Sequence, residues 1–489
     1  MVSTPALPVS LDRDSAIPLA VQLAEELRSA AGDGRLRAGD RLPSTRALAA
    51  QLKVSRTVTA AAYEQLHAEG WIAGRHGSGT YVTTEPPGAM RRPSKRPRAE
   101  DWDDALVDLT PGSPWAGGID RAAWRRAWRA AADGVPLARP QRAGLRAYRA
   151  AVAEHLLRHR GLRVRDDLGD PAGWHPGHHN SAGRHPAGRN PAGRDAGEAV
   201  VATAGTSAAV AELAASVLRP GDSVAVEEPG YQRAVGAMRA AGLRILPAPV
   251  DADGLLVDSV PESVRAVYCS PAHQYPLGGR MSAGRRVALV ERARREGWLV
   301  IEDDYDGELR YDVAPLPLLA ALAPDVVVHL GTTSKILTPT LGVGWMVAPP
   351  PVVSAVLAHR EASGTGPAPA GQLVLVELAR HGDLGRHLRR LRRELSERRS
   401  ILVDALVAGG VPVVGDEAGA HVVVLVDSAD KERDLLHSAR RHGLLLDGLA
   451  RHHCGRPRWF GVALGYAACS RDQLHDCLPI LTELLRPTR

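Results

Sequence analysis

The chain has 489 residues, a formal charge of +6 and 44% hydrophobic residues. This length indicates about two to four domains, the composition is that of a soluble globular protein, and the mild positive charge permits a polyanionic partner. The four cysteines form no CxxC pair, so we expect neither a disulfide framework nor a metal site. No apolar run is long enough to cross a bilayer and the first residues do not resemble a secretion signal, so we expect a cytoplasmic protein.

The first predicted element is an amphipathic helix in which leucines recur at every fourth position from Leu19 to Leu27. Several glycines then break the chain. Ser44 is a good N-cap for a second helix, in which Leu48 and Leu52 should face inward.

A third helix is predicted over residues 56–67, after a short turn and with Ser55 as its N-cap. Two short helices joined by a tight turn form a helix-turn-helix. Glycines then separate two extended pieces, at 71–72 and 80–83, which predicts a hairpin that would serve as a wing. The residues expected to contact DNA lie at the starts of the second and third helices and at the wing: Arg46, Ser55, Arg56, Thr57, Thr59, Arg75, His76 and Gly77.

The stretch LPSTRALAAQLKVSRTVTAAAYEQLHAEGWIAGRHGSGTYV is similar to the winged helix of GntR-family regulators, and the similarity covers nearly the whole segment 14–83. It implies a domain that binds double-stranded operator DNA. Many relatives place a basic residue on the third helix where this chain has Ala60, so the sequence of the operator stays open.

Two segments differ in composition from their surroundings. Residues 84–104 combine four prolines with five Arg or Lys and predict an extended basic linker, because such a segment buries little apolar surface. From 105 to 489, helical and strand patterns alternate as in an α/β protein. Residues 166–198 interrupt that pattern with AGR and PAGR repeats, and we expect a disordered surface insertion there rather than a metal site built from its histidines.

Two segments of the 105–489 region offer groups for an anionic ligand. At 203–207 the sequence TAGTS follows an apolar strand and precedes a helix, and a glycine with hydroxyl residues at a helix N-terminus is typical of an anion cradle. At 227–233, Tyr231 supplies a flat ring for stacking and Arg233 a group that binds carboxylates.

Two further segments carry titratable groups at strand ends. The acids of IEDDYD at 301–306 follow an apolar strand, and α/β folds bind ligands at the carboxyl ends of strands. GTTSK at 331–335 places Lys335 in the same kind of position, where partial burial lowers the pKa of an amine and suits Schiff-base chemistry. The Walker pattern is absent, which excludes a P-loop.

The phrases EEPGY, SPAHQYPLGGRMS, IEDDYDGELRY and LGTTSKILTPTLGVGW resemble the aminotransferase-like half of MocR-type regulators, also called the GabR group. The resemblance implies an N-terminal winged helix-turn-helix followed by a fold-type I aminotransferase-like α/β domain. That domain should have a mostly parallel central sheet and a smaller C-terminal α+β subdomain. The resemblance also implies pyridoxal 5'-phosphate as cofactor, a homodimer, and a transcription regulator that responds to the cofactor or to an amino compound.

The resemblance assigns roles to individual positions. Lys335 should bind the cofactor covalently, and Asp303 should pair with the pyridine nitrogen so that the ring acts as an electron sink. Tyr305 should hydrogen-bond the 3'-oxygen of the ring, Tyr231 should lie beside the ring, and Arg233 should meet an effector carboxylate. The phosphate should be bound by Thr206, Ser207 and Ser334, and the pocket should be lined by His273 and Gln274.

Two positions depart from the pattern of the relatives. Gly342 stands seven residues after Lys335, where relatives usually carry a phosphate-binding Arg. Ala463 stands where many aminotransferases carry the Arg that binds the substrate carboxylate, and Arg458 is a nearby candidate replacement. Three hypotheses stay open: a ligand-responsive regulator, an active aminotransferase with a DNA-binding appendage, and a DNA-binding protein whose large domain is only a scaffold. The two departures weigh against efficient transamination and favour the first.

Overall fold

The computed structural model describes residues 9–32, 35–75, 79–83, 106–135, 137–164, 199–311 and 316–486. The chain divides into two units, residues 1–103 and 104–489. The predicted linker at 84–104 and the predicted insertion at 166–198 lie outside the described residues.

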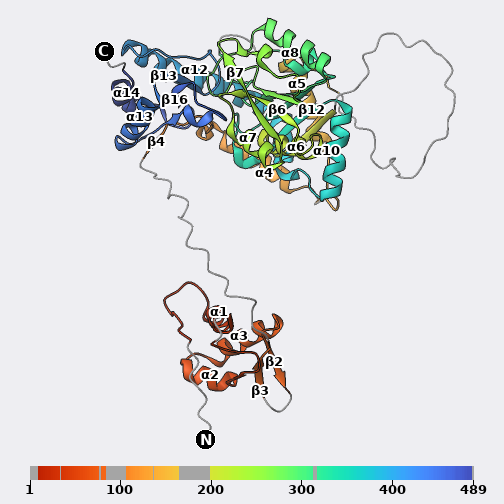
Figure 1. Cartoon of the computed structure of the whole chain (residues 1–489), viewed down its shortest axis with the longest axis vertical. Coiled ribbons are helices and arrows are strands. Elements are labelled where there is room, and N and C mark those ends of the chain that lie inside the picture. Colours follow the sequence, from red (N-terminus) through yellow and green to blue (C-terminus); the bar gives the residue numbers. More distant parts are fainter. Residues whose placement is uncertain are drawn as a thin grey trace, which may run out of the picture. The chain divides into compact units, whose positions relative to one another are not determined.

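The first unit contains three helices and a three-stranded sheet (Figure 1). Leu23 and Leu27 of the predicted stripe are buried, and they share one core with Leu48 and Leu66. The order of helix, helix-turn-helix and hairpin is therefore as the sequence predicts. The helices are α1 (Leu19–Gly32), α2 (Thr45–Leu52) and α3 (Arg56–Ala68), and the strands are β1 (Arg41–Leu42), β2 (Ile72–Arg75) and β3 (Gly79–Val82), in the antiparallel order β1-β3-β2.

The second unit is built on an eight-stranded sheet in the order β5-β12-β11-β10-β9-β6-β7-β8. Five consecutive strands of this sheet run parallel to one another: β11, β10, β9, β6 and β7. At the two ends of this series, β12 is antiparallel to β11 and β8 is antiparallel to β7. The expected mostly parallel sheet is confirmed. The strands are β5 (Ala199–Thr203), β6 (Ser223–Glu228), β7 (Arg244–Asp251), β8 (Gly254–Leu255), β9 (Ala266–Cys269), β10 (Leu299–Asp304), β11 (Val327–Thr332) and β12 (Gly344–Ala348).

Both faces of this sheet are covered by helices. Alternate residues along a strand point to opposite faces, so Ile301 packs in a core with residues of α6, α7 and α10, whereas Val300 packs in a second core with residues of α5, α8 and α12. The helices are α4 (Arg121–Ala132), α5 (Arg146–Arg160), α6 (Thr206–Ser216), α7 (Gln232–Ala240), α8 (Ala283–Glu296), α9 (Leu319–Leu322), α10 (Pro350–Ser363), α11 (Pro369–Arg380) and α12 (Asp383–Ala408).

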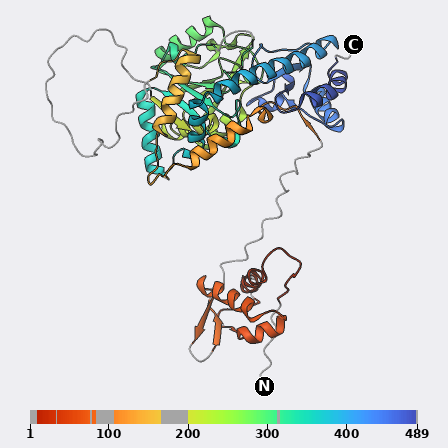
Figure 2. The same cartoon turned by 180° about the vertical axis from the view of Figure 1, so that it is seen from behind.

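A smaller α+β subdomain follows α12, as the resemblance implied. In Figure 2 the long α12, coloured blue, runs from the large sheet toward this subdomain. Its three-stranded sheet has the order β13-β16-β15, and a separate short strand pairs with the beginning of the unit. The elements are β13 (His421–Val426), α13 (Ala429–Arg441), β14 (Leu444–Leu445, paired with β4, Val107–Asp108), β15 (Asp447–Gly448), β16 (Phe460–Gly465) and α14 (Arg471–Leu485). Among the described residues, no helix combines the length and the apolar character that a bilayer crossing requires.

Candidate functional site

The helix-turn-helix is held by the caps that the sequence predicts. The Ser44 hydroxyl accepts a hydrogen bond from the Ala47 amide at 3.2 Å, and the Ser55 hydroxyl accepts one from the Val58 amide at 3.4 Å. Between the two helices, Lys53 adopts a left-handed conformation with φ 52°. This tight turn sets the angle at which α3 leaves α2, so the starts of both helices are presented as one surface.

Most of the predicted DNA contacts lie on that surface. Arg46, Ser55, Arg56 and Thr57 are all exposed. Backbone amides at helix N-termini and side chains of these types are the groups that bind DNA phosphates and base edges.

Thr59 corrects the prediction. Its side chain is fully buried, and its hydroxyl donates to the carbonyl oxygens of Thr45 at 2.9 Å and Arg56 at 3.0 Å. It therefore joins α2 to α3 and does not face DNA. At the wing, the side chain of Arg75 and all of His76 and Gly77 lie outside the described residues.

Arg41, which the sequence did not single out, lies at the base of the wing. It is exposed, and it belongs to β1, which pairs with the wing strand β3. A Cβ atom added at Gly79 would lie 2.9 Å from Arg41 Nε, so the guanidinium rests directly against the backbone of β3. Gly79 has φ +118°, a conformation that favours glycine. Arg41 adds a cation to the wing side of the head, the winged-helix domain at residues 14–83.

In the second unit, Lys335 follows β11 and reaches across to another segment. Its Nζ donates to the Gly112 carbonyl oxygen at 2.6 Å. Burial lowers the pKa of the amine, while the charges of Asp306 and Asp303 raise it and that of Arg233 lowers it further. A lowered pKa favours the neutral amine, which is the nucleophilic form. Gly112 is a part of the site that the sequence patterns missed.

Asp303 lies near the end of β10, on the face of the sheet that α6 and α7 cover. The Tyr268 hydroxyl donates to Oδ2, whereas Oδ1 is buried with no hydrogen-bond partner in the described structure. Burial raises the pKa of Asp303 to about 7, although the bond from Tyr268 lowers it. A buried carboxylate oxygen without a partner is costly, and a protonated ring nitrogen would satisfy it.

The neighbouring acids point elsewhere. Asp304 forms a buried ion pair with Arg160 of α5, and Glu302 accepts the amides of Leu319 and Ala320 at 2.7 and 3.2 Å. Of the three acids in this segment of β10, only Asp303 therefore offers an unused oxygen, as the assigned pyridine partner requires.

Tyr305 and His273 are bonded to each other. The Tyr305 hydroxyl lies 3.0 Å from His273 Nδ1, which also lies 2.8 Å from Asp306 Oδ2. Gln274, predicted to line the pocket, is buried, and its amide donates to the Pro229 and Tyr275 carbonyl oxygens and accepts from the Leu277 amide. Gln274 thus braces the loops around the site.

Aromatic rings form one wall of the site. Tyr275 packs edge-on against both Tyr231 and Tyr305, with ring centroids 5.9 Å apart in each pair. His421 of β13 lies 5.7 Å from Tyr275, and burial lowers the pKa of this imidazole to about 4. The sequence assigned no role to Tyr275, although it follows the predicted pocket residues His273 and Gln274, and His421 comes from a segment that the sequence did not connect with the site.

The predicted anion cradle forms where β5 turns into α6. Gly205 has φ +112°, and a Cβ atom there would lie 3.5 Å from Thr332 Oγ1 and 4.0 Å from Ser334 Oγ. Ser334 therefore stands beside the N-terminus of α6, where Thr206 begins the helix. The Ser207 hydroxyl lies 3.0 Å from the Tyr231 hydroxyl. Backbone amides and hydroxyls at a helix N-terminus are groups that suit a phosphate.

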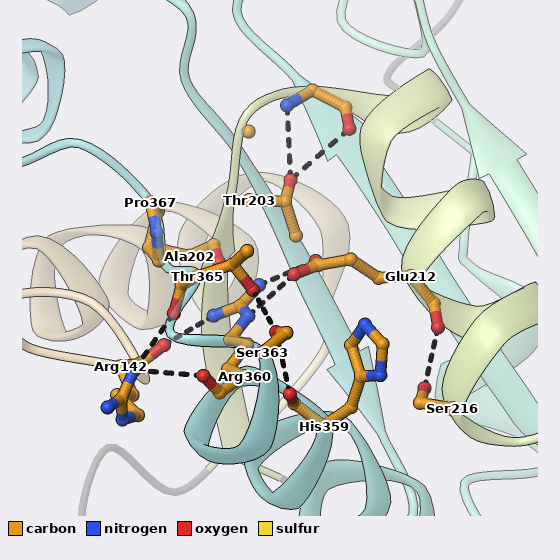
Figure 3. Close-up of polar contacts among 12 residues, drawn as sticks. Arg142, Ala202, Thr203, Glu212, Ser216, His359, Arg360, Ser363, Thr365 and Pro367 are labelled. Carbon is orange, nitrogen blue, oxygen red and sulfur yellow. Dashed lines mark hydrogen bonds and ion pairs between the residues drawn. The ribbon is translucent and has the colours of Figure 1, made fainter. Parts of the chain in front are cut away.

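An ion pair between a buried arginine and a partly exposed glutamate fixes the scaffold of this cradle (Figure 3). Arg360 of α10 bonds both carboxylate oxygens of Glu212 on α6, and it also donates to the carbonyl oxygens of Arg142 and Ala202. Arg360 is 1% exposed. One guanidinium thus ties α6, the end of β5 and the segment before α5 together, which holds the N-terminus of α6 in place.

The two departures from the family pattern have clear structural settings. Gly342 adopts φ +61° at the end of a short 3-10 helix (Pro339–Leu341), and an added Cβ would meet no described atom within 4 Å. Ala463 is fully buried and pairs with Asp447 of the neighbouring strand. Arg458 is exposed, and no described hydrogen bond of its side chain turns it inward. Arg233, also exposed, lies close enough to Lys335 to lower the pKa of that amine.

The residues present fit pyridoxal 5'-phosphate. Lys335 is an amine of lowered pKa, Asp303 is an acid with a buried unpaired oxygen, and Tyr231 and Tyr305 lie beside them. The cofactor, when bound, would supply the electron sink. Different residues of this chain would bind the ring nitrogen, the ring oxygen and the phosphate of the cofactor.

Comparisons with known proteins agree with both units. Residues 19–82 match the family of bacterial regulatory proteins of the gntR type, and residues 185–478 match aminotransferase class I and II. The chain is 33% identical to the HTH-type pyridoxine biosynthesis transcriptional regulator PdxR of Corynebacterium glutamicum, over 98% of each chain. It is 32% identical to the probable rhizopine catabolism regulatory protein MocR of Rhizobium meliloti, over 95% of this chain and 93% of that one.

Solved structures support the fold of the second unit. Kynurenine aminotransferase of Pyrococcus horikoshii superposes with a TM-score of 0.67 at 23% identity, covering 78% of this chain and 91% of that one. A multiple-substrate aminotransferase of Thermococcus profundus gives the same TM-score at 21% identity, with the same coverage. At these identities the likeness concerns the fold.

Proposed function

Because this chain belongs to the MocR/GabR type of GntR-family transcriptional regulators, we propose that it senses pyridoxal 5'-phosphate, or an amino compound bound with it, through Lys335. Binding of the ligand shifts the affinity of the head for operator DNA. The observation that carries this proposal is the buried, unpaired Oδ1 of Asp303 beside an amine of lowered pKa.

The DNA-binding part of the proposal rests on the head. We propose that Arg46, Arg56 and Thr57 contact the duplex, together with Arg41 at the base of the wing. Their exposure and their place at the starts of α2 and α3 support this. As in the related regulators, we propose a homodimer, which would present two such heads to two half-sites.

The ligand part of the proposal gives each polar group one task. Asp303 holds the ring nitrogen, Tyr305 holds the 3'-oxygen, and Ser207 and Ser334 with the start of α6 hold the phosphate. Arg233, exposed at the first turn of α7, meets the carboxylate of an effector. Regulation further requires that the ligand bind one DNA-binding arrangement better than another, since a ligand without such a preference shifts no equilibrium.

Absorption spectroscopy of the purified full chain tests the cofactor site. Added pyridoxal 5'-phosphate should produce a visible absorption band in the wild-type protein, and Lys335→Ala should abolish it. Affinity for DNA selected from a random library should then change on adding the cofactor at fixed salt, because salt alone alters such affinities. A chain that takes up no cofactor would overturn the sensor, and unchanged DNA affinity would leave the large unit as a scaffold.

Half-reactions separate the sensor from an active aminotransferase. Lys335, Asp303 and Tyr305 serve both functions, but Ala463 leaves the buried carboxylate-binding position without a cation. We therefore expect slow or no conversion when the cofactor-loaded protein is mixed with a panel of amino acids. Rapid spectral conversion with any of them would favour the enzyme.

A further inference from the structure

A second cavity lies on the face of the large sheet opposite to Asp303. Its volume is about 210 Å³, it is partly open to solvent, and it is lined by α5, α11, the start of α12 and residues on either side of Lys335. Trp345 of β12, in its wall, belongs to the core of the α5 face, whereas Tyr268 beside Asp303 belongs to the core of the other face. None of the cofactor-site residues assigned above lines this cavity.

The walls of the cavity are mainly apolar. Most of the wall residues are aliphatic or small, and one is an indole; the polar ones are two histidines, Thr333 and the exposed ion pair of Glu154 with Arg158. The apolar part of such a lining favours an apolar guest: an engineered apolar cavity of roughly 150 Å³ binds benzene. The principal apolar wall residues are Val152, Ile336, Trp345, Leu375, Leu384 and Leu388.

One corner of the cavity is polar. His155 points its Nε2 at Glu308 Oε1, 3.1 Å away, and Glu308 is 2% exposed. Burial alone would raise the pKa of Glu308, but the bond from His155 and the charge of Arg160 lower it to about 2. The ring of His159 lies 5.0 Å from that of His155. Two imidazoles thus face the cavity, and one is held in place by a buried carboxylate.

We propose that this cavity is a second small-molecule site, for a single-ring aromatic compound that carries one hydrogen-bond acceptor. The ring fills the apolar part beside Trp345 and Leu388, and the acceptor, a carbonyl or carboxylate, takes a hydrogen bond from the imidazole pair. The volume accommodates one ring with a short polar substituent but not a nucleotide.

The position of the cavity couples it to the segment that carries Lys335. Thr333 and Ile336, on either side of Ser334 and Lys335, are both wall residues. The Ile336 carbonyl oxygen is also held by Nε2 of the buried His387 at 2.6 Å. A guest that presses on this segment would shift Lys335, and by reciprocity cofactor binding would alter affinity for the guest. This coupling rests on the proposed function, whereas the cavity itself does not.

Ligand-observed NMR on the cofactor-free full chain tests the site. Benzamide and benzoate are the probes, and toluene is the ring without an acceptor. Saturable transfer to benzamide or benzoate is expected in the wild-type protein, and it should weaken at least tenfold in Ala151→Phe and in Ala379→Leu, which fill the cavity from α5 and α11. Ala147→Phe, exposed on α5 and not a wall residue, is the matched control and should bind as wild type.

Each result of this experiment either supports or overturns the proposed site. Binding lost in either filling variant, with an unchanged far-UV spectrum, supports the site, and the second variant covers the case in which the first does not fold. Toluene that binds as well as benzoate would overturn the role of the imidazoles. Equal probe binding in all variants, or no saturable binding in the wild type, would overturn the site. Repeating the titration with Lys335→Ala keeps this result independent of cofactor uptake.

Discussion

Replacing Asp303 with Asn should stabilise the cofactor-free protein. Burial raises the pKa of this carboxyl from 3.8 to about 7, so the folded state binds the proton more tightly than the unfolded state. Stability therefore falls as the pH rises from about 4 to about 7, and above that range the loss is complete. Since one pKa unit corresponds to about 1.36 kcal/mol, ionised Asp303 costs about 4 kcal/mol at pH 8.

An Asn cannot ionise and avoids that loss, but its own unpaired amide costs about 1–3 kcal/mol. We expect Asp303→Asn to raise the free energy of unfolding by about 1–3 kcal/mol at pH 8, and the effect to change sign near pH 4, where wild-type Asp303 is protonated and only the cost of the unpaired amide remains. The same change should weaken cofactor binding about 10- to 150-fold, because a hydrogen bond to a charged group contributes about 1.5–3 kcal/mol.

Urea unfolding followed by circular dichroism at several pH values measures the first effect, and a spectroscopic cofactor titration measures the second. Asp304→Asn is the control from the same strand. It removes the partner of the buried Arg160 and should destabilise the protein by about 3–5 kcal/mol. If Asp303→Asn destabilises the protein at pH 8 as Asp304→Asn does and leaves cofactor affinity unchanged, Asp303 is a structural acid and the reasoning fails.

Three further predictions concern the scaffold, the phosphate and DNA. Arg360→Met leaves the partly exposed Glu212 and two carbonyl oxygens without their donor, so it should cost about 1–3 kcal/mol in urea unfolding; a loss under 1 kcal/mol would refute that role. Gly342→Arg should tighten cofactor binding about tenfold or more in titrations while costing about 1–2 kcal/mol of stability for the left-handed backbone. Thr57→Ala should weaken DNA binding in anisotropy assays without changing the free energy of unfolding. Thr59→Val should lower the free energy of unfolding without changing the DNA affinity of the folded protein. Identical behaviour of the two variants would contradict the exposure of Thr57 and the burial of Thr59.

Local patterns indicated the two strand ends that carry Lys335 and Asp303, whereas the choice of Asp303 among its neighbouring acids came from the family resemblance. Each follows a short apolar strand, and in a parallel sheet the carboxyl ends of such strands converge at one edge. The caps Ser44 and Ser55 were predictable for a similar reason, because a cap acts on amides two or three residues away. These features depend on interactions close in sequence.

The partners of those residues were not predictable from such patterns. Lys335 bonds to Gly112, 223 residues earlier in the chain, and Tyr268 reaches Asp303 from an adjacent strand, 35 residues before it. Nothing local marks Gly112 or Tyr268 as functional, since the contact exists only after the sheet has formed. His421 enters the site from the smaller subdomain, and no sequence pattern around Lys335 includes it.

The misplacement of Thr59 has a different cause, and a signal for it was present. Thr59, Ala62, Tyr63 and Leu66 are the buried residues of α3. Their spacing of three, four and seven residues is that of an inward helical face. Grouping Thr59 with Thr57 by closeness in sequence ignored the rotation of about 100° per residue that separates adjacent side chains on a helix.

The pairing of Ala463 with Asp447 argues for sensing over transamination. Directly paired residues of neighbouring strands point to the same face, so the position at which many aminotransferases hold a substrate carboxylate faces an acid here. The Asp447 carboxylate is buried, and its charge is used by Arg451 and His452. Position 463 itself therefore offers a substrate carboxylate no cation, and under the proposed function the carboxylate binds nearer the surface, at the exposed Arg233. Such a binding mode holds the amine near Lys335 less rigidly, which suits a reversible signal better than repeated turnover.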